Sequence, residues 1–148
     1  MFRKSPKGLE VLLAHPGGPY FRNKDEGAWT VPKGEAAEDE ELLARARIEF
    51  EEELGIAAPA AANWIALGSV KQKGGKIVHA WAFEGDCRAD FVAASNNFEL
   101  EWPPRSGQMQ QFAEIDRAEF FSIEEARRKI KEAQIAFLDR LVEALGTA

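Results

Sequence analysis

Residues 39–54 place apolar side chains at the spacing of one face of an α-helix. These side chains lie three or four positions apart, which matches the 3.6-residue turn of a helix: they are Leu43, Ala46, Phe50 and Leu54. Gly55 follows directly, where a glycine commonly ends a helix. The sequence therefore predicts an amphipathic helix over 39–54 that packs its apolar side against a core.

Strand patterns lie on both sides of this helix. The expected strands cover residues 8–15, 64–72, 76–84, 98–102 and 118–121, and a short extended piece covers 29–31. Gly74 and Gly75 predict a tight hairpin between the second and third strands, because paired glycines tolerate positive φ. Two more helices are expected at 122–130, opened by a capping box at Ser122, and at 132–145. This order predicts one α/β domain over residues 1–148, with a mixed sheet between helices.

The composition limits the class of protein. A chain of 148 residues, 45% of them hydrophobic, can bury one core of ordinary size. No apolar stretch approaches the roughly 20 residues of a membrane span, and no signal peptide is visible. The single cysteine, Cys87, cannot form an internal disulfide and is expected to be inert. We therefore expect a cytoplasmic protein without membrane contact.

The negative charge is concentrated in one segment. Residues 34–55 contain nine acidic and two basic residues, whereas the whole chain has a net charge of −6. A protein of this kind is a poor candidate for binding a nucleic-acid polymer, which requires neutralisation of phosphates. Clustered carboxylates instead favour a bound cation.

Three of these carboxylates share one face of the expected helix. Glu49, Glu52 and Glu53 stand at positions i, i+3 and i+4, with Cβ atoms about 5–6 Å apart. Like charges at this spacing destabilise a helix unless something compensates them, and Mg²⁺ prefers such oxygen ligands. The alternative is a solvated acidic face, which is common in glutamate-rich helices.

The segment from Gly34 to Ile56 resembles the Nudix box, G-x5-E-x7-R-E-U-x-E-E-x-G-U, in which U is bulky and apolar. Eight of the nine fixed positions match, and they are Gly34, Glu40, Glu49, Phe50, Glu52, Glu53, Gly55 and Ile56. The preceding Trp29-x-x-Pro32-Lys33-Gly34 is similar to the lead-in found in the branch with diadenosine tetraphosphate hydrolases.

The resemblance implies a Nudix α/β/α sandwich with a mixed β-sheet and a hydrolase of nucleoside diphosphates linked to another group. Glu49 and Glu53 would be the main ligands of Mg²⁺ or Mn²⁺, bound as two or more ions. Glu52 would be a third ligand or would hold a metal-bound water, and the Gly34 carbonyl would complete the shell. Glu40 would orient the turn into the helix. The catalytic assignments are thus Glu40, Glu49 and Glu52.

Two features depart from the family pattern. Ile48 replaces the arginine that pairs with the neighbouring carboxylates, although Arg45 lies at i−4 from Glu49 and could replace part of that charge pairing. The chain also starts at a segment like Phe2-Arg3-Lys4, without the usual opening strand. The expectation is either a fold with one strand fewer or a truncated start.

Further candidates lie outside the box. Glu99 and Glu101 share one face of the strand at 98–102 and could add a distal metal ligand, or they could form a plain acidic surface. Lys33 and Arg105 could bind substrate phosphate. Trp29 could stack on a base, although a tryptophan in a strand is more often part of a core. Both histidines, His15 and His79, are expected to be packed and hydrogen-bonded.

The expected substrate is a nucleotide, and a dinucleoside polyphosphate such as diadenosine tetraphosphate is favoured. Hydrolysis of nucleoside triphosphates or ADP-ribose stays open, because the box determines the chemistry and not the specificity. A non-catalytic Nudix-fold nucleotide sensor is an alternative that Ile48 makes plausible. The chain is expected to be a monomer or a homodimer.

Overall fold

A computed structural model describes residues 1–31, 41–58, 64–86 and 97–146. The strands are β1 (Phe2–Ser5), β2 (Gly8–Pro16), β3 (Ile65–Lys71), β4 (Ile77–Ala82), β5 (Asn97–Glu101), β6 (Met109–Ala113) and β7 (Ile115–Ser122). The helices are α1 (Leu42–Leu54), α2 (Ile123–Lys129) and α3 (Ile135–Leu145), with short 3₁₀ turns at Lys73–Gly75 and Glu132–Gln134.

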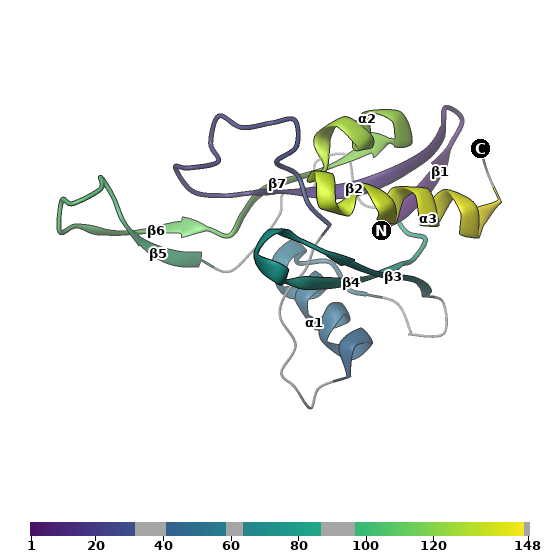
Figure 1. The fold of residues 1–148 in the computed structure, drawn as a ribbon, viewed down its shortest axis with the longest axis horizontal. Coiled ribbons are helices and arrows are strands. Elements are labelled where there is room, and N and C mark those ends of the chain that lie inside the picture. The colour runs from purple at the N-terminus through teal and green to yellow at the C-terminus, as the bar shows by residue number, and fades with distance from the viewer. Residues whose placement is uncertain (32–40, 59–63, 87–96, 147–148) are drawn as a thin grey trace.

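The body of the molecule is layered, with strands between helices. Strands β1, β2 and β7 form an antiparallel sheet in the order β1-β2-β7, and β3 pairs antiparallel with β4. A parallel bridge between Phe2 and Glu84 joins the end of the β3–β4 unit to β1. Figure 1 shows α1 on one side of these strands and α2 and α3 on the other. The predicted α/β/α sandwich with a mixed sheet is confirmed.

Strand β2 is buried on both faces and divides the core in two. Val11 and Leu13 belong to the cluster that contains residues of α2 and α3. Leu12 and Ala14, which alternate with them, belong to the second cluster, together with Phe50 of α1. Because successive side chains of a strand point to opposite faces, one apolar run supplies both cores and fixes helices on both sides.

The hairpin of β5 and β6 extends outward from the layered body (Figure 1). Its strands pair with each other, and Phe98 faces Phe112 across the pair. Trp102, just beyond β5, packs edge-to-face on Tyr20, with ring centroids 5.3 Å apart. The hairpin is therefore held partly by the loop that follows β2.

The sequence predicted most of these elements and missed two strands. The predicted strands at 8–15, 64–72, 76–84, 98–102 and 118–121 are confirmed as β2, β3, β4, β5 and β7, and all three helices are present. The predicted hairpin at Gly74 and Gly75 is also confirmed, with φ values of 83° and 84°. Strands β1 and β6 were not predicted. No helix among the described residues is long and apolar enough to cross a membrane.

Candidate active site

Helix α1 begins at Leu42 and ends at Leu54, so it matches the predicted helix within the part that is described. Glu41 is its N-cap residue, without a side-chain cap. Gly55 ends it in the left-handed conformation at φ 69°, and its N–H donates to the carbonyl of Glu51. The glycine suits this position because it has no Cβ to clash at positive φ. Three of the predicted site residues, Lys33, Gly34 and Glu40, lie outside the described residues.

The three carboxylates of α1 differ in their exposure. Glu53 is buried, with 7% of its surface exposed, whereas the side chains of Glu49 and Glu52 are 15% and 44% exposed. The interpretation of this face as uniformly solvated is therefore wrong for Glu53. Burying a carboxylate costs free energy unless it is hydrogen-bonded or paired with a cation. The Glu53 carboxylate, next to buried Leu54, therefore requires such a partner. Glu53 does interact with other groups of the chain.

Arg45 supplies positive charge to this face. Its Nη2 donates to Oε1 of Glu49 one turn further along α1, and it lies 3.8 Å from Oε2 of Glu52. Ile48, where the family pattern has arginine, is 43% exposed and outside the core. The expected compensation by Arg45 is thus present in the structure. This pairing offsets the repulsion among neighbouring carboxylates on the helix.

The donor set suits a hard divalent cation, although the described residues do not enclose one. Within the described ranges, no group of three or more His, Cys, Asp or Glu side chains is placed to hold a metal ion. Mg²⁺ usually keeps several waters and binds through one or two carboxylates together with substrate phosphates. Glu49 and Glu53, one turn apart on α1, fit that mode of binding. The magnesium or manganese site stays a prediction.

Glu99, Glu101 and Arg105 lie on the outward hairpin. Both glutamates are exposed and alternate with the less exposed Phe98 and Leu100, as the predicted strand requires. The structure does not bring these glutamates into one metal-binding group with the carboxylates of α1. Arg105 is exposed in the turn after β5, with a positive φ of 62°. Nothing in the described contacts connects it to α1.

Trp29 is a core residue, which corrects its assignment to substrate binding. Only 1% of its surface is exposed, and its ring packs edge-on against His15 and Phe121, with centroids 5.0 and 4.9 Å away. Its indole N–H donates to Oδ1 of Asp25 over 2.8 Å. No face of the ring is left for a base. The sequence favoured a core position for a tryptophan in a strand, and the structure has it there.

The two histidines have different environments. His15 is fully buried, and its ring nitrogens lie 2.8 Å from Asp116 Oδ1 and 2.6 Å from the Lys24 carbonyl oxygen. The expectation of a packed, hydrogen-bonded histidine is confirmed for His15. It is wrong for His79, which is exposed and stacked near Trp81 on β4. Alternation along β4 puts His79 on the opposite face from Val78 and Ala80, and the packing of those two residues in the core makes theirs the buried face.

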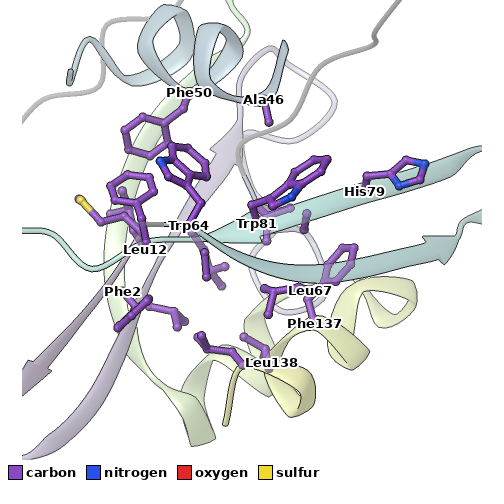
Figure 2. Close-up of a pocket in the computed structure, with 18 residues that line it drawn as sticks. Phe2, Leu12, Ala46, Phe50, Trp64, Leu67, His79, Trp81, Phe137 and Leu138 are labelled. Atoms are coloured by element: carbon purple, nitrogen blue, oxygen red, sulfur yellow. The ribbon is translucent and has the colours of Figure 1, made fainter. Parts of the chain in front are cut away.

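A largely apolar pocket lies between β4 and α1. It is a cavity of about 70 Å³ that extends past the strands toward α3. Trp81 and His79 of β4 line it together with Ala46 and Phe50 of α1. Figure 2 shows both rings on the α1 side of the strand and Leu138 on the opposite side. The pocket therefore adjoins the helix that contains Glu49 and Glu53.

Several solved structures have a similar fold. A Caenorhabditis elegans Ap4A hydrolase, in a binary complex, is 20% identical with a TM-score of 0.60, covering 98% of this chain and 93% of its own. The NUDIX domain of Shewanella oneidensis NrtR, complexed with ADP ribose, is 16% identical with a TM-score of 0.62, covering 97% and 82%. A mutT/nudix family protein from Listeria innocua is 19% identical with a TM-score of 0.57, covering 98% and 88%.

These likenesses show that the chain has the Nudix fold. No protein-family model and no curated protein matches its sequence. At 16–20% identity the similarity concerns the fold, and the activity has to be argued from the residues themselves.

Proposed function

We propose that this chain is a Nudix hydrolase that cleaves a phosphoanhydride bond of a nucleotide with the help of Mg²⁺ or Mn²⁺. The observation that supports it most is the carboxylate face of α1, where Arg45 pairs with Glu49 and Glu53 is buried. This face occupies the box spacing of a chain that has the Nudix fold. A purely structural acidic surface would not require a buried glutamate in the last turn of the helix.

Each residue has a distinct role in the proposal. Glu49 and Glu53 would hold the cation, which neutralises phosphate charge and lowers the pKa of a bound water. Arg45 fixes the rotamer of Glu49 and so orients one ligand oxygen. Glu52, the most exposed of the three, would accept a hydrogen bond from the water that attacks phosphorus. Gly34 and Glu40 would complete the arrangement from outside the described residues.

A dinucleoside polyphosphate is the preferred substrate. The lead-in Trp29-x-x-Pro32-Lys33-Gly34 resembles the branch with diadenosine tetraphosphate hydrolases, and the fold is similar to that of an Ap4A hydrolase. Nucleoside triphosphates and ADP-ribose are the next candidates. The similar NUDIX domain of NrtR, complexed with ADP ribose, supports including the latter.

The second candidate function is nucleotide binding without turnover. The observation that favours it is Ile48, an exposed apolar residue at the position where the family has arginine. The pairing of Arg45 with Glu49 argues against binding without turnover, because Arg45 supplies the positive charge that is absent at Ile48.

A nucleotide panel tests the proposal. The purified chain is incubated with diadenosine tetraphosphate, nucleoside triphosphates and ADP-ribose, with Mg²⁺, with Mn²⁺ or with a chelator, and products are separated by chromatography. The proposal expects metal-dependent cleavage of at least one compound. If every compound stays intact with both metals, the enzyme assignment fails and the sensor assignment gains.

A further inference from the structure

Strand β4 presents two aromatic rings on its less buried face. Val78, Ala80 and Ala82 are buried, whereas His79 is exposed and Trp81 is only partly buried. The rings of His79 and Trp81 are close to parallel, at 23°, with centroids 6.3 Å apart. Residues i and i+2 of a strand point to the same side, so both rings face the same space.

That space is the pocket beside α1. Ala46 and Phe50 of α1 line it together with the two rings, and Figure 2 shows the rings on the α1 side of β4. Glu49 lies three positions after Ala46 on the same helix. A ligand resting on the rings would therefore have its other end near the carboxylate face of α1.

The other aromatic side chains at the pocket are more closely packed than this pair. Trp64 and Phe83, which also line the pocket, pack against each other at a tilt of 41° with centroids 4.6 Å apart, and Phe83 is 3% exposed. His79 is exposed and Trp81 is partly buried, and both line the pocket. Planar, partly exposed rings bind nucleobases by stacking, and this is tolerant of base identity because every base has a π face.

A cation lies on the same side of the β3–β4 unit. In the register of these strands Ser69 is opposite His79 and Lys71 is opposite Ile77, so Lys71 shares the face of the two rings. Lys71 is exposed. An aromatic platform flanked by a lysine suits a nucleotide, whose base is planar and whose phosphates are anionic, better than it suits a neutral aromatic compound.

We propose that His79 and Trp81 form the platform on which the base of the nucleotide stacks, so that its phosphates extend toward α1. This inference rests on the proposed function, and it specifies where the substrate is recognised. It gives Trp81 and His79 a role in binding and leaves the chemistry to the carboxylates.

Binding calorimetry with two non-hydrolysable probes tests the platform. The probes are α,β-methylene-ADP, which has a base, and methylenediphosphonate, which has none, both with Mg²⁺. For Trp81→Ala we expect the Kd of α,β-methylene-ADP to rise about 10-fold or more, since stacking on one ring is worth about 1–3 kcal/mol. Affinity for methylenediphosphonate should not change. Trp81→Phe should keep most of the affinity, and His79→Ala should lose part of it.

Trp102→Phe on the outward hairpin is the matched control and should bind both probes like the wild type. Unchanged affinity for α,β-methylene-ADP in folded Trp81→Ala and His79→Ala would overturn the platform, as would a wild-type chain that does not bind it. If the probe binds through Trp81 but no nucleotide is cleaved, the platform stands and the hydrolase assignment fails. If cleavage persists with an unchanged KM in Trp81→Ala, the hydrolase stands and the platform fails.

Discussion

Arg45 donates a hydrogen bond to the carboxylate of Glu49, one turn further along α1. The pair is partly buried, with side chains 25% and 15% exposed, so solvent screens it less than an exposed pair. It places a cation among three glutamates at a point where the usual arginine of the box is replaced by Ile48. A cation three positions before Ile48 therefore pairs with a carboxylate of this helix face.

Removing Arg45 should impair the hydrolysis that we propose. For Arg45→Ala we expect kcat/KM to fall about 10- to 100-fold, the usual cost of losing a group that orients a metal ligand. Ile48→Arg in that background should restore part of the loss, because it returns a cation to the same face. The measurement is steady-state kinetics on the best substrate of the panel.

Ile48→Arg in the otherwise natural chain is the control, and its gain should be small, since exposed ion pairs are worth about 0–1 kcal/mol. Wild-type kinetics in Arg45→Ala would show that the pairing does not serve catalysis. Lower activity after Ile48→Arg in both backgrounds would show that Ile48 has a packing role.

Trp29 should matter for stability and not for substrate binding. Replacing it with alanine removes a ring that is 1% exposed and packed between His15 and Phe121, and large-to-small changes of this kind cost about 3–5 kcal/mol. Urea unfolding followed by circular dichroism gives the free energy of unfolding.

The milder Trp29→Phe tests the binding role, because it keeps an aromatic ring in the core. It should leave the KM for the nucleotide unchanged while lowering stability through loss of the hydrogen bond to Asp25. A raised KM in a folded Trp29→Phe protein would return Trp29 to the binding site.

Asp25 should make stability depend on pH on the acid side. Hydrogen bonds from the Lys129 ammonium and the Trp29 indole N–H hold the pKa of Asp25 below its ordinary value of 3.8. A carboxyl with a lowered pKa stabilises the folded chain above the unfolded-state value, and this contribution is lost as the pH falls through the folded-state pKa.

Asp25→Asn tests this because it keeps an oxygen for the indole N–H but has no charge for Lys129. The wild type should be more stable than the variant at pH 7, and the difference should shrink as the pH falls below about 4. Thermal unfolding of both proteins across this range measures it. A difference that stays constant from pH 7 to the lowest pH would contradict the role of the ionised carboxylate.

The sequence pattern of a single segment is sufficient to predict an element whose structure depends mainly on that segment. The apolar run of β2 and the paired glycines between β3 and β4 gave elements close to those observed. Strand β6 has no such pattern, since Met109, Gln110 and Gln111 are all exposed. It is a strand because β5 lies beside it, which is information outside the segment.

The site was predicted less well than the fold. Spacing put Glu49, Glu52 and Glu53 on one helix face, but helical period alone could not show that Glu53 is buried, because that depends on what packs against the helix. The exposure of His79 could not be predicted for the same reason. Its strand pattern was correct, and the identity of the buried face followed from contacts of Val78 and Ala80 with distant residues.

The most direct test of the account is to compare wild type, Glu53→Gln and Glu51→Gln in Mg²⁺-dependent cleavage of the best nucleotide. Glutamine keeps the shape of Glu53 and removes its charge, so kcat should fall about 100-fold or more while the fold survives. Glu51 is exposed, accepts from the Ala58 N–H at 3.0 Å, and is outside the proposed metal site, so Glu51→Gln should cleave like the wild type. A folded Glu53→Gln protein with near wild-type kcat would contradict the central claim that the carboxylates of α1 hold the catalytic metal.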